Sequence, residues 1–63
     1  MARNGQPRVL LVEDEPAQRT VLAYNLEAEG FAVTQADNGE DAMVLVDEED
    51  PDIIILDWMM PKV

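Results

Sequence analysis

The sequence predicts an α/β fold built in the order strand, helix, strand, helix, strand. Three short segments rich in apolar and β-branched residues, at 8–14, 31–36 and 53–57, alternate with two segments of helical periodicity. Helical crossovers between consecutive strands imply parallel strands and right-handed connections. This alternation is typical of a doubly wound sheet with helices on its faces. The 63 residues suffice for at most one small domain.

The first strand and helix are predicted from the opening apolar run. Residues 9–12 are apolar and precede two acids, and a run this short, β-branched at both ends, indicates a buried strand. Asp14 or Glu15 then caps a helix that starts at Pro16, because the N–H that proline lacks would be unpaired there anyway. Gly30 ends the helix, since glycine tolerates the left-handed C-cap. Helical spacing predicts an apolar face of Ala17, Val21, Leu22 and Leu26.

The remaining elements are predicted from alternation and from turn signals. Residues 31–36 alternate moderately and are rich in β-formers, which indicates a second strand. Residues 37–41 turn into a second helix, and residues 47–52 form an acidic loop in which Pro51 prevents the helix from continuing. The apolar side of this helix is predicted to contain Ala42, Met43, Leu45 and Val46. Residues 53–57 form a third strand, apolar on both faces, as in the helix-covered interior of parallel sheets.

Composition limits the classes of partner and cofactor. The chain has no cysteine, which excludes disulfides, and no histidine, so any bound metal should be a hard, oxygen-liking cation. The net charge of −10 argues against contact with nucleic acid or an anionic membrane. The longest apolar run, 53–56, is far shorter than a membrane span, and residues 1–8 lack a signal-peptide core. We therefore expect a cytoplasmic protein whose residues 1–7 are a flexible lead-in.

Three carboxylates follow the predicted strands at one edge of the sheet. Glu13 and Asp14 leave the first strand, and Asp57 leaves the third. If these strands are neighbours, their backbones lie about 4.8 Å apart, so the acids repel one another unless a cation joins them. Magnesium suits such a site because it binds carboxylates, waters and phosphate oxygens. A carboxylate beside Mg²⁺ can also attack phosphorus, while the metal neutralises charge on the transferred group.

Each of these features also has a simpler interpretation. The acids at 13–14 alone are typical of a helix cap, and a lone Asp57 after an apolar strand is typical of a cap or turn. Met59 and Met60 suit packing or loop positions, although a backbone carbonyl there can coordinate a metal, and Trp58 suits packing at a pocket rim. The conjunction of acids at two strand ends within one βαβαβ unit favours the cation site.

Four segments resemble the receiver domains of bacterial two-component response regulators. They are VLLVEDE at 9–15, EGF at 29–31, ADNGEDA at 36–42 and PDIIILDWMMP at 51–61. Within this family the likeness is greatest to the winged-helix regulators. The resemblance implies a flavodoxin-like (CheY-like) fold, of which this chain would be the N-terminal βαβαβ part, with strand order 2-1-3 out of 2-1-3-4-5.

The resemblance also implies roles for particular residues. Asp57 matches the phospho-acceptor, which takes phosphate from a sensor histidine kinase. Glu13 and Asp14 match the acidic pair that holds Mg²⁺, and Met59 matches the position whose backbone carbonyl completes the metal site. The chain would then be a signalling module of a phosphorelay that regulates transcription, and not an enzyme.

The chain departs from the family pattern in what it lacks. The family's Ser/Thr after the fourth strand and Lys after the fifth contact the phosphoryl group, and neither is present, because Lys62 does not match the family position. We therefore expect residues 8–63 to be an N-terminal fragment, a partial receiver domain of three strands and two helices. Its third strand would be an exposed edge, through which the chain is expected to self-associate.

Two other functions remain as alternatives. One is a truncated half-domain that only self-associates, without phosphorylation. The other is a Mg²⁺-dependent phosphohydrolase, but such enzymes usually need a second Asp where this chain has Met59. A nucleotide-binding Rossmann unit is disfavoured because the turn after the first strand has no glycine-rich sequence.

Overall fold

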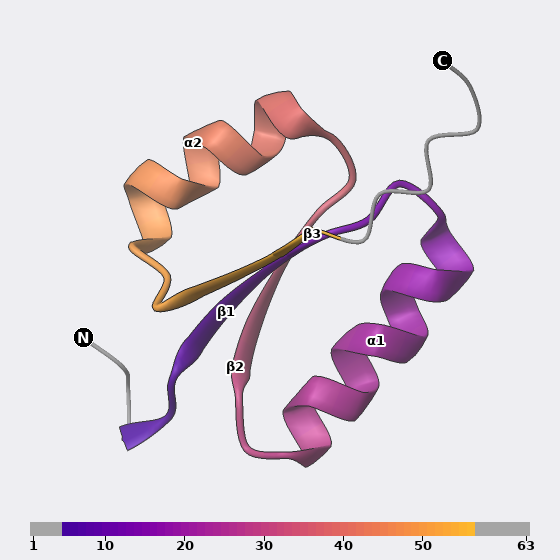
Figure 1. The fold of residues 1–63 in the computed structure, drawn as a ribbon, viewed down its shortest axis with the longest axis vertical. Helices are drawn as coiled ribbons and strands as arrows, with labels where there is room; N and C mark the ends of the chain where they lie inside the picture. The colour runs from indigo at the N-terminus through magenta and orange to yellow at the C-terminus, as the bar shows by residue number, and fades with distance from the viewer. Residues whose placement is uncertain (1–4, 57–63) are drawn as a thin grey trace.

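The computed structural model describes residues 5–56, which form three strands and two helices in alternation (Figure 1). The elements are β1 (Arg8–Val12), α1 (Pro16–Ala28), β2 (Ala32–Ala36), α2 (Gly39–Glu49) and β3 (Ile53–Leu56). The predicted order of elements is therefore confirmed. Most of the predicted flexible lead-in, and the predictions for Asp57, Trp58, Met59 and Lys62, lie outside the described residues.

The three strands form one parallel sheet in the order β2-β1-β3, as predicted. In the register, Val12 at the end of β1 lies opposite Ala36 of β2 and Leu56 of β3. All three strands therefore finish at the same edge of the sheet. In a doubly wound sheet this carboxyl edge is where ligands bind.

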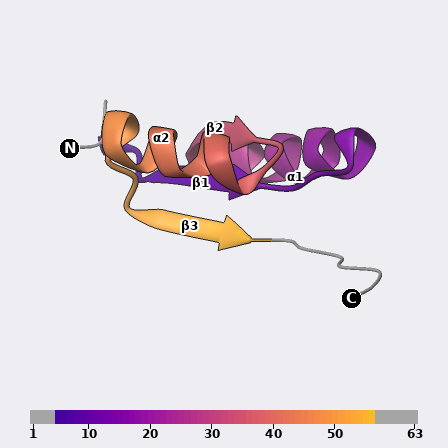
Figure 2. The ribbon, with the colours of Figure 1, turned by 90° about the horizontal axis from the view of Figure 1, so that it is seen from above.

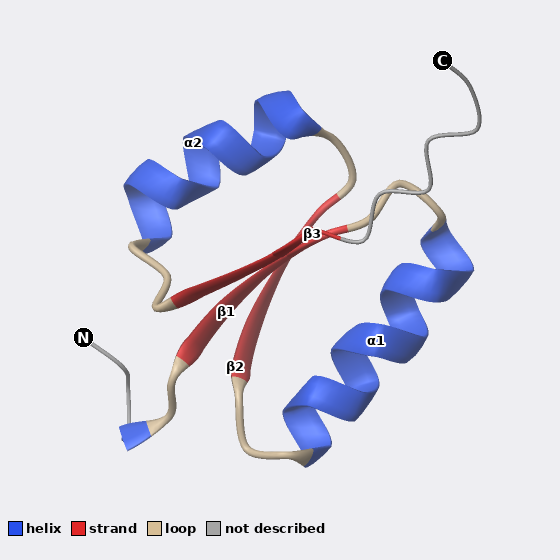
Figure 3. Ribbon diagram, in the orientation of Figure 1, coloured by secondary structure: helices blue, strands red, loops and turns tan. Residues whose placement is uncertain are grey.

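The two helices lie on opposite sides of the sheet (Figure 3). Side chains alternate along β1, so Leu10 and Val12 share one face while Val9 and Leu11 share the other. On the first face Leu10 and Val12 form a buried cluster against which α2 packs Ala42 and Leu45. All four of these β1 residues are at most 4% exposed, so the central strand is the core of the molecule.

The strand β3 is not covered by either helix. Both helices pack on β1 and β2, and Figure 2 shows β3 displaced to one side of the helical layer. Ile53, Ile54 and Leu56 are 41%, 49% and 59% exposed. The prediction that this strand lies in a helix-covered interior is wrong, because within residues 5–56 it pairs with β1 alone. The prediction of an exposed third-strand edge is confirmed.

The helix α1 begins at Pro16 and is followed by Gly30, as predicted. Gly30 has φ of 102°, a left-handed conformation that favours glycine. The Gly30 N–H donates to the Glu27 carbonyl at 3.0 Å, and the Phe31 N–H donates to the Leu26 carbonyl at 3.1 Å. These two bonds form a Schellman motif, which satisfies carbonyls that the helix end leaves without intrahelical donors.

The buried face of α1 differs from the predicted one. Leu22 and Leu26 are half-buried as expected, but Ala17 and Val21 are exposed. Ala23, which helical spacing had not singled out, is 3% exposed. Among residues 5–56 the helix packs mainly on β1 and β2, so one stripe of it is covered while Ala17 and Val21 are exposed.

The helix α2 starts earlier and ends later than the sequence suggested. The Asn38 side chain caps it by accepting a hydrogen bond from the Asp41 N–H at 2.8 Å. The helix continues to Glu49, because Pro51 restricts only the residue before it, Asp50, which takes a left-handed conformation with φ of 49°. Of the predicted apolar side, Ala42 and Leu45 pack on the core. Met43 and Val46 are 75% and 40% exposed, so the prediction is wrong for these two.

Arg8 fastens the amino end of the sheet to the end of α2. Its guanidinium Nη1 donates to the Glu49 carbonyl at 2.9 Å, and Nη2 lies 3.6 Å from Glu49 Oε1. A cation at this position is favourable because the carboxyl end of a helix carries partial negative charge. The Arg8 N–H also donates to Asp52 Oδ2 at 2.8 Å, just before β3. The first strand, the second helix and the third strand are thus joined at one point.

Candidate functional site

The acid pair predicted from the sequence lies directly after β1, at the carboxyl edge of the sheet. Glu13 is 1% exposed, whereas the next residue, Asp14, is exposed. The side chains at 9, 11 and 13 alternate onto one side, so Glu13 continues the buried face of the strand. The two acids thus occupy different environments, one within the fold and one at its surface.

Glu13 is held by both its backbone and its side chain. Its N–H donates to the Ala36 carbonyl of β2 at 3.0 Å, which extends the β1–β2 pairing beyond the strand. Its carbonyl accepts a hydrogen bond from Arg19 Nη1 at 2.9 Å. Its carboxylate oxygen Oε2 accepts from the Glu15 N–H at 2.9 Å. The buried acid therefore has a fixed position between two strands and the first turn of α1.

The predicted cap of α1 by Asp14 or Glu15 is wrong as to its mechanism. Glu15 occupies the N-cap position, but its side chain makes no capping hydrogen bond. The Glu15 N–H instead donates a hydrogen bond to the carboxylate of Glu13, which precedes it in the sequence. A carboxylate near the start of a helix is favoured by the helix dipole, so Glu13 provides the stabilisation that a side-chain cap would otherwise give.

The other two predicted metal ligands, Asp57 and Met59, lie outside the described residues. Within residues 5–56, no group of three or more Asp or Glu side chains is arranged to hold a metal ion. The described part of the chain therefore supplies the pair Glu13 and Asp14. Leu56 pairs with Val12. In the sequence, Asp57 follows Leu56 and Glu13 follows Val12. The role of Asp57 in a shared site stays a prediction.

The donor set of the described pair fits magnesium. Both side chains offer carboxylate oxygens, which are the ligands that Mg²⁺ prefers. Exposed Asp14 leaves room for the waters that Mg²⁺ retains, and buried Glu13 stands at the same strand end. The oxygen donors of this pair are thus compatible with a partly hydrated Mg²⁺.

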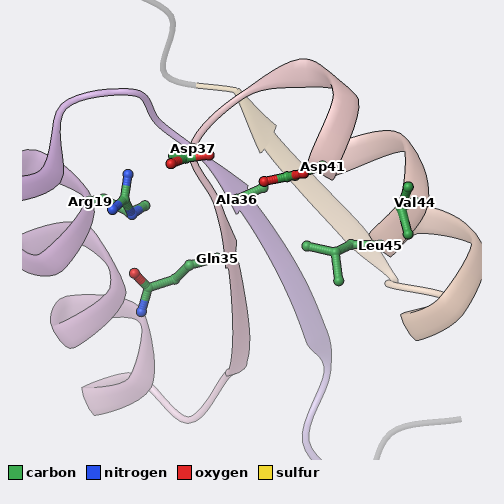
Figure 4. Close-up of a pocket in the computed structure, with 7 residues that line it drawn as sticks. All are labelled: Arg19, Gln35, Ala36, Asp37, Asp41, Val44 and Leu45. Carbon is green, nitrogen blue, oxygen red and sulfur yellow. The ribbon is translucent and has the colours of Figure 1, made fainter.

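Sequence reasoning missed Arg19, which lies beside the acid pair. It lines an open pocket of about 540 Å³, where Figure 4 shows Arg19 and Gln35 between α1 and β2, and Asp37 also lines this pocket. The other lining residues are Ala36, Asp41, Val44 and Leu45. A signal was present in the sequence, because Arg19 is a basic residue one helical turn after the acidic stretch of residues 13–15.

None of the described helices is long and apolar enough to cross a membrane.

In a comparison with protein families, residues 9–63 match the response regulator receiver domain. The matched region contains the whole of the predicted site, including Asp57 and Met59. The parallel sheet of order β2-β1-β3 agrees with the fold that the sequence resemblance implied.

The curated relatives of this chain include several transcriptional regulators. The chain is 49% identical over 57 residues to the phosphate regulon transcriptional regulatory protein PhoB of Rhizobium meliloti, which covers 90% of this chain and 25% of that protein. It is 46% identical over 55 residues to the alkaline phosphatase synthesis transcriptional regulatory protein PhoP of Bacillus subtilis, covering 87% and 23%. It is 42% identical over 57 residues to the master transcriptional regulator RpaA of Synechocystis, covering 90% and 24%.

The segments YNLEAEGF at 24–31 and LDWMMP at 56–61 resemble PhoB in particular, and the 49% identity to PhoB of Rhizobium meliloti confirms this resemblance. The chain spans about a quarter of the length of these relatives. With the family model matching 55 of its 63 residues (9–63), the chain belongs to the response regulator receiver domain family.

Proposed function

We propose that residues 8–63 are the phospho-accepting receiver segment of a two-component response regulator, with Asp57 as the acceptor. The observation that carries this proposal is the pairing of Val12 with Leu56. The acids Glu13 and Asp57 come next after these two residues in the sequence. Adjacent parallel strands that end together are where doubly wound folds bind their ligands.

The proposed site draws oxygen donors from both strand ends. The side chains of Glu13, Asp14 and Asp57 and the backbone carbonyl of Met59 would hold Mg²⁺. When bound, Mg²⁺ supplies positive charge that neutralises the charge gathering on a transferred phosphoryl group. The chain contributes a buried Glu13 held by hydrogen bonds and an Asp14 accessible to solvent.

In the proposed transfer the Asp57 carboxylate is the nucleophile. One of its oxygens bonds to the phosphorus of a phosphohistidine on the sensor kinase while the phosphorus–nitrogen bond breaks. The histidine nitrogen then takes up a proton from water. The product is an aspartyl phosphate, which would be the signal passed through a phosphorelay to transcription.

The proposed partner is a sensor histidine kinase. It would phosphorylate the longer, cytoplasmic protein of which this chain is a part. The names of the relatives, which are transcriptional regulators, support a role in regulating transcription. The net charge of −10 disfavours direct contact between this segment and nucleic acid or an anionic membrane. DNA binding would then belong to another part of such a protein.

Acetyl phosphate treatment followed by intact-protein mass spectrometry tests the acceptor. We expect weak incorporation at most, since the family's Ser/Thr and Lys are absent from this sequence. Any phosphoprotein should require Mg²⁺ and disappear in Asp57→Asn. Asp47→Asn changes an exposed aspartate of α2 and should leave incorporation unchanged. Equal incorporation in Asp57→Asn and wild type would contradict the assignment.

The exposure of β3 favours a second proposed property, self-association of the chain. Ile53, Ile54 and Leu56 present an apolar edge strand, which is a template for pairing with another chain. Light scattering after size-exclusion chromatography should give more than the monomer mass at micromolar concentration. Ile54→Lys should return the chain to a monomer, whereas Met43→Lys, on the exposed side of α2, should not. A folded wild-type monomer would overturn this proposal.

The same experiments separate the alternatives. Self-association without any effect of Mg²⁺ would favour the half-domain that has no phosphorylation role. Release of inorganic phosphate from a phosphomonoester would favour the phosphohydrolase. The receiver assignment expects an effect of Mg²⁺ and no such turnover.

A further inference from the structure

Arg19 makes two hydrogen bonds that lie on either side of Asp14 in the sequence. Its guanidinium Nη1 donates to the Glu13 carbonyl at 2.9 Å. Its backbone N–H donates to the Glu15 carbonyl at 2.9 Å, in the first turn of α1. One residue of the helix therefore fixes the backbone both before and after the exposed acid.

The side-chain bond depends on the long donor side chain of Arg19, whereas the backbone bond is part of the helix. Any residue except proline at position 19 can donate its backbone N–H to the Glu15 carbonyl. Only a long side chain with a donor at its end reaches back six residues to the Glu13 carbonyl. The guanidinium bond is partly buried, so water competes with it less than at the surface.

We propose that Arg19 is a positioning residue for the cation site, which holds the Glu13 backbone so that Glu13 and Asp14 are aimed at one Mg²⁺. This inference rests on the proposed function. Mg²⁺ requires near-octahedral geometry with oxygens at about 2.0–2.1 Å, so small displacements of its ligands weaken binding. Partners that orient metal ligands typically contribute about 10–100-fold in affinity.

The sign of the expected effect separates positioning from electrostatics. Arg19 is a cation near the proposed site, so loss of its charge alone would strengthen Mg²⁺ binding. Loss of its hydrogen bond to Glu13 would weaken binding. A weaker affinity after removal of a positive charge is therefore evidence for the positioning role.

The experiment compares Arg19→Met with Arg8→Met. Arg8 also donates a guanidinium Nη1 hydrogen bond to a backbone carbonyl at 2.9 Å, but at the opposite end of the sheet. MgCl₂ is titrated into each metal-free protein, with the fluorescence of the single tryptophan, Trp58, as the readout. We expect the Kd of Arg19→Met to rise about tenfold. The Kd of Arg8→Met should stay within about twofold of wild type, although its melting temperature falls.

Three outcomes separate the positioning role of Arg19 from the proposed Mg²⁺ site on which it rests. If wild type binds Mg²⁺ and Arg19→Met binds equally well or more tightly, the positioning role is wrong and the cation site stands. If wild type does not bind Mg²⁺, both fall. If Arg19→Met is unfolded by circular dichroism, Arg19→Gln replaces it: glutamine is polar, but its amide lies two bonds closer to the backbone than the guanidinium Nη1 that reaches the Glu13 carbonyl, so a similar rise in Kd is expected, and an unchanged Kd overturns the inference.

Discussion

The two ends of the sheet differ in the charged groups that surround their arginines. At the amino end, Arg8 contacts the carbonyl and the carboxylate of Glu49, and its N–H meets the carboxylate of Asp52. At the carboxyl end, Glu13 and Asp14 stand together, and the guanidinium of Arg19 donates to a backbone carbonyl. The amino end thus pairs its cation with acids of the same chain. At the carboxyl end, Arg19 donates its guanidinium hydrogen bond to the Glu13 carbonyl.

Under the proposed function, the amino end contributes to stability and the carboxyl end binds the cation. A charge that is paired within the chain has less to offer a ligand, and a partly exposed pair such as Arg8 and Glu49 adds at most about 1 kcal/mol to folding. The exposed carboxylate of Asp14 is accessible to a cation in solution. The hydrogen bond between the Glu13 carboxylate and the Glu15 N–H restrains the backbone around Asp14. In doubly wound folds ligands likewise bind at the carboxyl ends of the strands.

The largest expected effect comes from the strand that joins the two ends. Leu10→Ala removes a fully buried side chain from the middle of β1 and should destabilise the fold by about 2–5 kcal/mol. In a domain this small that loss should abolish cooperative thermal unfolding and Mg²⁺ binding together. Ile54, its register partner in β3, is 49% exposed, so Ile54→Ala should cost about 1 kcal/mol or less. Equal losses in the two variants would show that β1 is not the core.

A smaller effect should be confined to the amino end. Arg8→Met removes the bonds to Glu49 and should lower the free energy of unfolding by about 1–2 kcal/mol. The loss should appear in urea denaturation, with the Mg²⁺ affinity unchanged. A large change in Mg²⁺ affinity would mean that the two ends are not independent.

The smallest effect should distinguish the two helix starts. Asn38→Ala removes the side-chain cap of α2 and should cost about 1 kcal/mol. Glu15→Ala should cost less, because the Glu15 side chain makes no capping bond and its N–H still reaches Glu13. Thermal melts of both variants without metal make the comparison. A greater loss for Glu15→Ala would contradict this account of how α1 begins.

The order of elements could be predicted because it depends on local patterns. The short apolar runs, Pro16 and Gly30 each specify a backbone conformation from their own chemistry. The burial of β3 could not be predicted in the same way. Residues 9–12 and 53–56 are similar runs of four apolar residues, yet the first is buried and the second exposed. The difference lies in the neighbours that each strand has, which the run itself does not encode.

The acid pair could be located from the sequence because both residues follow a recognisable strand. The partners that hold it could not. The Glu13 carboxylate turns back to the Glu15 N–H, and Arg19 reaches the Glu13 carbonyl across the first turn of α1. Both contacts depend on the angle between β1 and α1, which no short motif specifies. The extra turn at the end of α2 was missed for a related reason, since acidic residues 47–49 resemble a loop in composition.

The most direct test of the shared cation site is the melting temperature with and without MgCl₂, in wild type and in Asp57→Asn. A ligand at ten times its Kd stabilises the folded state by about 1.4 kcal/mol. For a domain of this size each kcal/mol raises the melting temperature by about 4–8 °C. We predict such a rise for wild type and a much smaller one for Asp57→Asn. Equal shifts in both proteins, or none in either, would contradict a site shared by Glu13, Asp14 and Asp57.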